Sequence, residues 1–324
     1  MGGGSGLLGG FGLGQGATGE ERGQREEGQA EEAGSVHTAS DTRRAAGPLG
    51  KVSGMLQAGV VRGRGGWLGW GMIYPGLVSI TFRKLTVEAI VEAVQRTGLV
   101  GIEWGGDVHV PHGDIGTARR VRDLTVRAGL QVAAYGSYYR VGRSESEGLA
   151  FERVLETAIE LGAPTIRVWP GTAGSDATDE DGRWKIVREL QRIGDLATKA
   201  GVTVSLEYHG GTLTDTDASA SQLLVEVDHA NVFTCWQPHV GATAEAALAG
   251  LQDVRSRLSN LHVFHWGPTP NDRRPLAEGE DAWARYLAAA RTVEGDRYAL
   301  LEFVKDDSLA ALAEDAATLR RWLM

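Results

Sequence analysis

Carboxylates and imidazoles recur along the chain close to the ends of short apolar segments. Glu103, Glu207 and Glu302 each lie at or next to the last residue of such a segment. Six of the eight histidines lie on or soon after segments of the same kind: His109, His112, His209, His239, His262 and His265. Oxygen ligands with an imidazole favour Mn²⁺, Mg²⁺ or Co²⁺, and Zn²⁺ also binds such sets. Gathered on one rim, these side chains could hold one divalent metal ion; the alternative is that they are solvated loop residues.

The segments that carry these residues alternate with amphipathic helical patterns. Eight β-branched runs are predicted strands: residues 78–82, 100–104, 131–135, 165–169, 202–207, 232–236, 261–265 and 298–303. Between them, apolar residues recur at the helical spacing i, i+3, i+4, i+7, as at Val87, Ile90, Val91 and Val94. Eight strands, each followed by a helix, in about 250 residues predict an α/β fold of the (β/α)8 TIM barrel type, with a doubly wound open sheet as the alternative.

Helix boundaries are also marked in the sequence. Thr86 and Ser308 are predicted N-caps. Glycines stand where four helices should end: Gly98, Gly129, Gly162 and Gly201. A TIM barrel builds its active site from the C-terminal ends of its strands and the loops after them. The carboxylates and histidines therefore fall where a barrel enzyme would place its catalytic groups.

The first 72 residues differ in composition from the rest of the 324-residue chain. They hold 22 of the 46 glycines, and their seven acidic and seven basic side chains cancel, so the formal net charge of −9 belongs to residues 73–324. We expect residues 1–72 to be a disordered Gly/Glu-rich extension, because they bury too little apolar surface to offset chain entropy. A GxGxxG match at residues 14–19 is attributed to composition, since neither a strand nor an apolar helix flanks it.

Composition argues against several classes of protein. Cys235 is the only cysteine, so the chain can form neither an internal disulfide nor a Cys-rich metal cluster. No run reaches the ~18 apolar residues of a membrane span, and a secretory signal fits the sequence poorly. The excess of 42 acidic over 33 basic side chains argues against nucleic-acid binding. We expect a cytoplasmic protein that binds a small molecule, with neither a membrane nor a nucleic acid as partner.

Seven motifs resemble the sugar phosphate isomerase/epimerase group, which has a xylose isomerase-like TIM barrel. They are VSITFR, GIEWGGDVHVPHG, VAAYGSYYR, SLEYHGGTLTDT, CWQPHVG, NLHVFHW and ALLEF. The resemblance covers about residues 73–323, so we assign residues 73–324 to the barrel domain. It implies a metal-dependent isomerase or epimerase that acts on a sugar or sugar phosphate by proton transfer next to a carbonyl, through an enediolate. Relatives are often oligomers, so the resemblance also implies a homo-oligomer.

The resemblance implies a set of metal ligands as well. Members of the group hold one divalent ion with strand-end residues that match Glu207, His262 and Glu302 here. At the sixth strand those epimerases usually carry an aspartate with a histidine three residues later, whereas this chain has Gln237 followed by His239. Gln237 can offer a neutral carbonyl oxygen, and we expect it to be the fourth ligand. The alternatives are that His239 replaces it or that the site is weakened.

Roles in catalysis and substrate binding follow from the same resemblance. Glu207 and Glu302 would be the acid/base pair, one removing a proton and the other returning it on the opposite face. The candidates for substrate binding are Glu103, His109, His209, His239, His265, Arg274, Trp104 and Trp236. Arg140 and Arg273 could also contact an anionic group, and Trp169 and Trp266 also lie at strand ends. For each tryptophan the alternative to a sugar-binding wall is a place in the barrel core.

Three other functions are alternatives for a barrel of this kind. An inosose-type dehydratase of cyclic polyols would use the same metal and base but expel water. A DNA-repair endonuclease would need more metal ligands and a basic groove, and the sequence indicates neither. A sugar-binding barrel without catalysis is the third alternative, and the neutral Gln237 motivates it.

Overall fold

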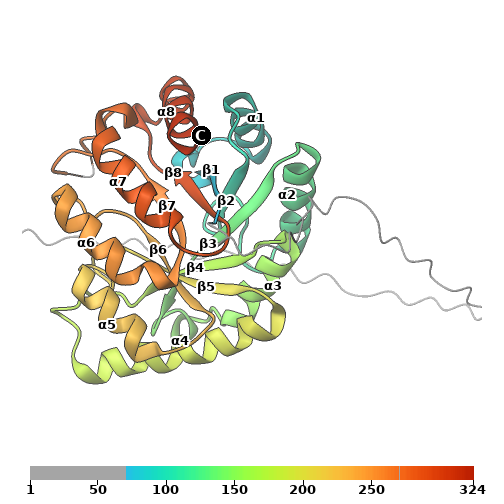
Figure 1. The fold of residues 1–324 in the computed structure, drawn as a ribbon. Coiled ribbons are helices and arrows are strands. Elements are labelled where there is room, and N and C mark those ends of the chain that lie inside the picture. The colour runs from blue at the N-terminus through green and yellow to red at the C-terminus, as the bar shows by residue number, and fades with distance from the viewer. Residues whose placement is uncertain (1–70, 270) are drawn as a thin grey trace, which may run out of the picture. The chain divides into compact units, whose positions relative to one another are not determined.

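Eight parallel strands form a closed barrel in the computed structural model, which describes residues 71–269 and 271–324 (Figure 1). The strands are β1 (Ile73–Val78), β2 (Gly101–Gly105), β3 (Gln131–Val141), β4 (Thr165–Pro170), β5 (Thr203–Glu207), β6 (Val232–Trp236), β7 (Leu258–Val263) and β8 (Arg297–Leu301). Each strand pairs with its sequence neighbours, and β1 pairs with β8 to close the ring. The closed ring confirms the predicted TIM barrel and rules out the open doubly wound sheet.

An α-helix follows each strand and packs against the outside of the barrel (Figure 1). The helices are α1 (Val87–Thr97), α2 (Ile115–Arg127), α3 (Phe151–Leu161), α4 (Glu180–Ala200), α5 (Asp217–Val227), α6 (Ala244–Val254), α7 (Glu280–Arg291) and α8 (Leu309–Leu323). Thr86 and Ser308 cap α1 and α8 through their side chains, as predicted. The glycines expected at helix ends all have a positive φ: Gly98, Gly129, Gly162 and Gly201.

The first strand differs from the prediction. Residues 78–82 were expected to be the strand, but β1 is Ile73–Val78 and Ser79–Phe82 forms a 3-10 helix. All four residues of that 3-10 helix are buried, so the strand-like residues Ile80, Thr81 and Phe82 reflect burial rather than strand geometry. Gly76 lies within β1. A Cβ at this position would approach the carbonyl oxygen of Gly101 to 2.6 Å, so the strand requires a glycine here.

The last two strands also end earlier than expected. β7 ends at Val263 and β8 at Leu301, so His265 and Glu302 follow their strands instead of lying within them. This places both residues in the loops that form the C-terminal rim of the barrel. The other predicted strands overlap the observed ones, and β3 extends as far as Val141.

The N-terminal end of the barrel is closed by β8 and the residues around it. The guanidinium of Arg297 is buried and donates hydrogen bonds to the carbonyl oxygens of Leu258, Val293, Glu294 and Gly295. Just before β1, the backbone N–H of Met72 donates to Asp296 at 2.9 Å, and its carbonyl accepts from Arg297 at 3.0 Å. These contacts stabilise the end of the barrel opposite the C-terminal rim.

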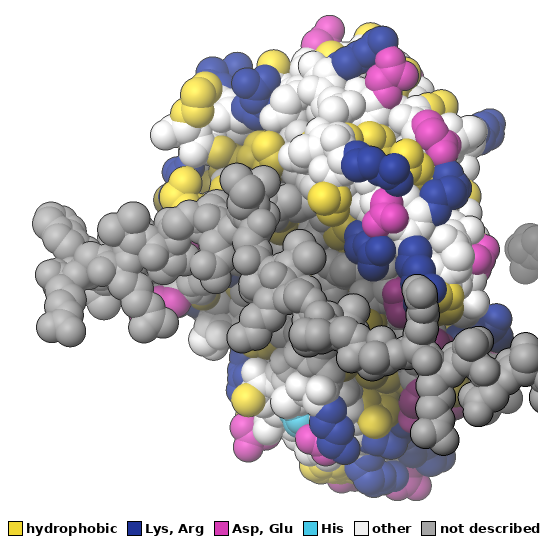
Figure 2. Space-filling view, turned by 90° about the vertical axis from the view of Figure 1, so that its right-hand side faces the viewer, with side chains coloured by type: hydrophobic (Ala, Val, Ile, Leu, Met, Phe, Trp, Pro, Cys, Tyr) yellow, Lys and Arg dark blue, Asp and Glu magenta, His cyan; other side chains and the backbone are white. Residues whose placement is uncertain are grey.

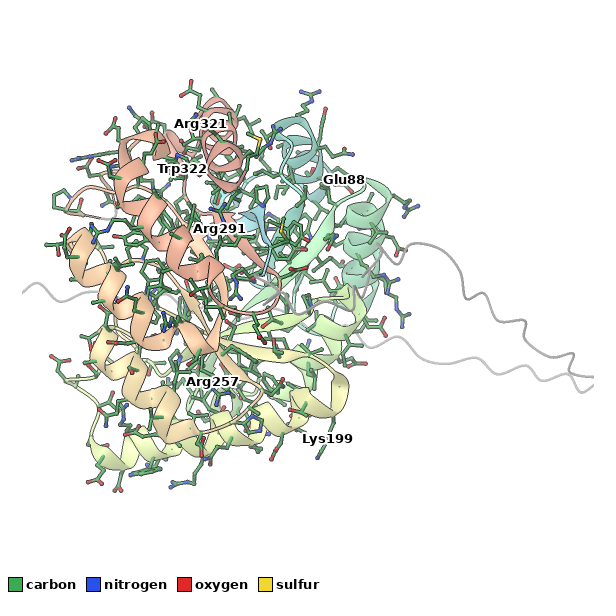
Figure 3. The ribbon with its side chains drawn as sticks, in the orientation of Figure 1. Glu88, Lys199, Arg257, Arg291, Arg321 and Trp322 are labelled. Carbon is green, nitrogen blue, oxygen red and sulfur yellow. The ribbon has the colours of Figure 1, made fainter. Side chains whose placement is uncertain are left out.

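The helix surfaces carry charges of both signs. Figure 2 shows Lys and Arg side chains interspersed with Asp and Glu on one face of the molecule. Glu88 of α1 and Lys199 of α4 lie at the periphery in Figure 3, where Arg291 and Trp322 lie on neighbouring helices. Arg291 of α7 donates to the carbonyl of Trp322 in α8 at 3.1 Å, which ties these helices together.

Among the described residues, the helices are too short or too polar to cross a membrane. The disorder expected for residues 1–72 falls, except for Gly71 and Met72, on residues 1–70, which lie outside the described ranges, as does the GxGxxG match at residues 14–19.

Candidate metal centre

Four neighbouring strands bring the predicted metal ligands to one place on the rim. Glu207 is the last residue of β5, and His262 lies near the end of β7. Gln237 and Glu302 directly follow β6 and β8. Single donor atoms of Glu207, His262 and Glu302 all lie within 4.8 Å of one another, and all three residues are buried.

His262 turns its Nδ1 atom toward the other three ligands. This nitrogen lies 3.1 Å from Oε1 of Gln237, 3.4 Å from Oε2 of Glu302 and 3.9 Å from Oε1 of Glu207. Ligand atoms at about 2.1 Å from an octahedral ion lie about 3.0 Å apart when adjacent and about 4.2 Å apart when opposite. The distances from His262 to the other three side chains therefore fit a shared divalent ion.

A second layer of polar side chains orients these ligands. Nε2 of His262 lies 3.3 Å from Oε2 of Glu103, and the other oxygen of Glu103 accepts a 2.6 Å hydrogen bond from Nε of Arg167. Arg167 also pairs with Glu207, and Trp169 donates its indole N–H to the same carboxylate oxygen. A carboxylate on the far nitrogen of a ligating histidine fixes the orientation of the ring and makes it a better ligand.

The charges of this cluster favour a cation. Glu103, Glu207 and Glu302 are each at most 4% exposed, and Arg167 is the guanidinium buried among them. Burial alone would raise the pKa of Glu103, but Arg167 and His262 lower it to about 2. Burial would likewise lower the pKa of His262, but Cys235, Glu302 and Glu103 raise it above its usual range. With His262 neutral, as it must be when it binds a metal, three carboxylates against one guanidinium leave two negative charges, which a divalent ion would balance.

Three of the predicted substrate-binding histidines lie on the rim. The ring of His209 stacks on Trp169 with centroids 4.3 Å apart, and burial lowers the pKa of His209. His239 and His265 both line a cavity of about 400 Å³ between the loops that follow β6 and β7. His239 also stacks on Tyr208, which directly follows Glu207 in the chain.

Trp104 and Trp236 do not lie where a sugar could reach them. Both are fully buried in the layer between strands and helices. The indole N–H of Trp104 donates to Thr125 of α2 at 3.2 Å, while Trp236 packs against Trp283 and Tyr286 of α7. Their placement contradicts the predicted contact with substrate: these strand-end tryptophans belong to the core.

The remaining substrate-binding candidates have other contacts. Glu103 lies behind His262 and holds it, so its placement does not agree with direct substrate binding. His109 is buried, with its Nδ1 3.0 Å from the hydroxyl of Ser79, and so stabilises the loop after β2 instead of facing the rim. Arg274 is exposed and pairs with Asp272 at 2.6 Å.

Sequence reasoning missed Arg167 altogether. It lies on β4 within an otherwise apolar run, where a charged residue requires a buried partner. That pattern was the available signal, although it does not reveal that the partners are Glu103 and Glu207. Tyr138 was also missed; its ring lies under the guanidinium of Arg167, with Cζ 5.4 Å from the ring centroid.

Comparison with known proteins identifies the family of the barrel. The family model described as the xylose isomerase-like TIM barrel matches residues 91–323. The chain belongs to this family. The resemblance inferred from the sequence motifs is thereby confirmed for the barrel.

Individual members of the family differ in what they do. The chain is 28% identical to 3-dehydroshikimate dehydratase of Bacillus anthracis over an alignment of 167 residues, which covers 48% of this chain and 58% of that protein. The crystal structure of the probable 3-DHS dehydratase AsbF from Bacillus anthracis has a TM-score of 0.65 and 21% identity, covering 76% of this chain and 99% of that one. The 3-keto-D-glucoside 4-epimerase YcjR of E. coli has a TM-score of 0.59 and 19% identity, covering 77% and 99%. At these identities the two solved structures show a shared fold.

Proposed function

We propose that this protein is a metal-dependent isomerase or epimerase that moves a proton at a carbon next to the carbonyl of a small carbohydrate. The observation that supports this is the convergence of Glu207, Gln237, His262 and Glu302, with His262 Nδ1 facing the other three. A divalent ion held by these four would polarise the carbonyl and stabilise the negative charge that develops on its oxygen.

The protein's own groups would transfer the proton. Glu207 and Glu302 come from β5 and β8, which are not adjacent in the barrel, so their carboxylates can approach a substrate carbon from different sides. One would take the proton and the other would return it. His209, His239 and His265 lie on the rim, where they would form hydrogen bonds with substrate hydroxyls.

Gln237 would set the charge of the centre. With two carboxylates, one imidazole and one amide as ligands, the ion and its ligands together would have no net charge. With an aspartate in place of Gln237, their net charge would be −1. The centre with Gln237 would bind the ion less tightly than the centre with an aspartate, but it would attract the negative charge that develops on the substrate oxygen more strongly. This supports catalysis at a weaker metal site over loss of the site.

A dehydratase is the second candidate. It would begin with the same proton removal next to a carbonyl and then expel a hydroxyl group as water. The specific observation that favours it is the sequence match to a 3-dehydroshikimate dehydratase.

Proton exchange with solvent tests both reactions. The Mn²⁺-loaded protein is incubated in D₂O with a panel of sugars, sugar phosphates and cyclic polyol ketones, and deuterium incorporation is followed by NMR. Uptake at one carbon with retention of all oxygens supports the isomerase or epimerase, and loss of water supports the dehydratase. Binding without exchange at any carbon would contradict both and indicate a non-catalytic sugar-binding barrel.

A further inference from the structure

One of the rim histidines faces a carboxylate from a neighbouring helix. Nε2 of His239, in the loop after β6, lies 3.5 Å from Oδ1 of Asp217, the first residue of α5. Both atoms are buried, and neither has a hydrogen-bond partner in the part of the chain that the structure describes. Leaving a buried donor or acceptor unpaired is costly. A small approach would bring the two atoms within the usual length of a hydrogen bond, about 2.7–3.2 Å.

The neighbouring helix α6 leaves room for this carboxylate. A Cβ at Gly250 would overlap the carboxylate of Asp217, so a larger residue at this position would displace it. Gly250 is buried in the middle of α6, where glycine is less favourable for the helix than alanine. Asp217 also lies in the first turn of α5, where the positive end of the helix dipole favours a negative charge. These features favour an ionised acceptor at this place.

The ring of His239 is held from a second side. It stacks on Tyr208, with ring centroids 5.0 Å apart and an angle of 27° between the planes. The backbone carbonyl of His239 accepts a hydrogen bond from the N–H of Ala242 at 3.0 Å. Burial raises the pKa of Tyr208, and the nearby charges of Asp217 and Asp253 raise it further. Stacking and the turn therefore keep Nε2 of the imidazole directed toward Asp217.

Nδ1 is the nitrogen through which this imidazole can contact a ligand. The side chain of His239 is 22% exposed and lines the cavity of about 400 Å³ between the loops after β6 and β7. Because Nε2 is enclosed, a polar contact from that side has to be made by Nδ1. In a neutral imidazole, the hydrogen bond of one nitrogen decides the state of the other. With its hydrogen on Nε2, the ring offers the lone pair of Nδ1.

From these contacts we infer that Asp217 is a positioning residue. It holds the imidazole of His239 with Nε2–H toward α5 and so presents the lone pair of Nδ1 to a hydroxyl group of the substrate. The contact with a substrate hydroxyl rests on the proposed function, whereas the orientation of the ring depends on the protein alone. The two parts can therefore be tested separately.

The NMR signals of the imidazole nitrogens test the orientation without any substrate. The histidines are labelled with nitrogen-15, and long-range proton–nitrogen spectra of the neutral rings show which nitrogen carries the hydrogen. His239→Gln identifies the signals of His239 by their loss. His229 is an internal reference: its Nδ1 accepts from the backbone N–H of Asn231 at 3.1 Å, and its Nε2 lies 3.2 Å from Asp195. We expect His239 to show the same Nε2–H pattern as His229.

Two variants disturb the pair in different ways. Asp217→Leu removes the acceptor, and Gly250→Ala displaces the carboxylate while favouring the helix. Each should convert the Nε2–H pattern of His239 into a mixture of both tautomers and leave His229 unchanged. Gly116→Ala in α2 is the matched control, since a Cβ at Gly116 has its nearest contact at 3.6 Å. An unchanged pattern of His239 in both variants would overturn the inference.

Solvent exchange tests the contact with substrate. The Mn²⁺-loaded protein is incubated in D₂O with D-fructose or scyllo-inosose over a range of concentrations, and deuterium uptake gives the apparent KM and kcat. For Asp217→Leu we expect KM to rise about tenfold with kcat nearly unchanged, as for loss of one binding contact, and no change for Gly116→Ala. An unchanged KM would overturn the inferred contact. No uptake by the parent protein with any member of the panel would contradict the proposed function, while a change of tautomer would still support the role of Asp217.

Discussion

At the scale of single residues, the candidate metal site depends on how Arg167 is placed. Its guanidinium connects Glu103, which holds His262, to Glu207, which is itself a candidate ligand. A Cβ at Gly136 would lie 2.6 Å from this guanidinium, so the neighbouring strand needs a glycine there. The four candidate ligands are thus oriented by a connected set of buried charges, and removing one member leaves the others uncompensated.

Replacing Arg167 with methionine should therefore destabilise the barrel strongly. Breaking one side of a buried ion pair costs about 3–5 kcal/mol, because a charge is left without its partner. The free energy of unfolding in urea measures the loss. Arg183→Met is the matched control, since Arg183 is partly exposed and pairs with Glu226 on the outer helices. A loss no larger than that of the control would show that Arg167 does not hold the site together.

Gln237 offers a second test at this scale. Gln237→Glu adds a negative charge at nearly the same length, and we expect metal affinity to rise about tenfold or more, since affinity follows the charge of the ligand set. Titration calorimetry with Mn²⁺ measures the change. Gln252→Glu adds the same charge on the exposed side of α6 and should have little effect. Equal affinities of Gln237→Glu and the parent protein would mean that Gln237 is not a ligand.

At the scale of elements, α8 is connected to the loop after β7 through a buried carboxylate. Asp315 of α8 accepts a 2.8 Å hydrogen bond from the backbone N–H of Leu276 and is 5% exposed. Burial raises the pKa of Asp315 to about 6, despite this hydrogen bond. The folded state therefore binds a proton more tightly than the unfolded state, and this group favours folding more as the pH falls toward 4.

Asp315→Asn should remove that pH dependence. From pH 7 to pH 5 the parent protein should gain about 1 kcal/mol of stability relative to the variant, because only the parent takes up the proton on folding. Urea unfolding of both proteins at the two pH values measures the difference. Identical changes in the two proteins would show that Asp315 has an ordinary pKa.

The elements also show what the sequence can and cannot predict. Seven strands and the caps Thr86 and Ser308 could be predicted because their signals are local. The first strand could not: Pro75 and Gly76 interrupt its pattern, and the more strand-like Ser79–Phe82 is a buried 3-10 helix. β-Branched and aromatic residues are typical both of strands and of other buried segments, and only the tertiary structure decides which of the two a segment becomes.

The same limit applies to the site. The convergence of Glu207, His262 and Glu302 follows from barrel topology, so it could be predicted. A shift of one residue in the register of a strand turns its side chains from the inside of the barrel to the outside. The sequence does not fix the register this closely, and therefore Trp104 and Trp236 were wrongly expected to contact the substrate. The left-handed backbone of Tyr138 and Phe303 depends on contacts between loops that no local pattern encodes.

At the scale of the whole molecule, the ligands connect four strands and their loops. An ion held by β5, β6, β7 and β8 would therefore bind the folded barrel and not the separated strands. Ligands that bind only the folded state stabilise it in proportion to the logarithm of their concentration over Kd.

Metal should accordingly raise the thermal stability of the protein. With Mn²⁺ at about 100 times its Kd, about 2.7 kcal/mol is expected, which corresponds to a rise in Tm of about 5–10 °C for a domain of this size. Calorimetry on chelator-treated and Mn²⁺-loaded protein measures the shift. The double variant Glu207→Gln, Glu302→Gln should show no such rise; a rise of the same size would place the ion elsewhere.

The most direct test of the central claim is proton exchange as a function of metal. The chelator-treated protein is incubated in D₂O with the best substrate of the panel, before and after addition of one equivalent of Mn²⁺, and deuterium at the carbon next to the carbonyl is measured by NMR. We predict no exchange without metal, full exchange after one equivalent, and none for Glu302→Gln in either state. Exchange that persists after chelation, or that survives in Glu302→Gln, would contradict metal-dependent proton transfer at this site.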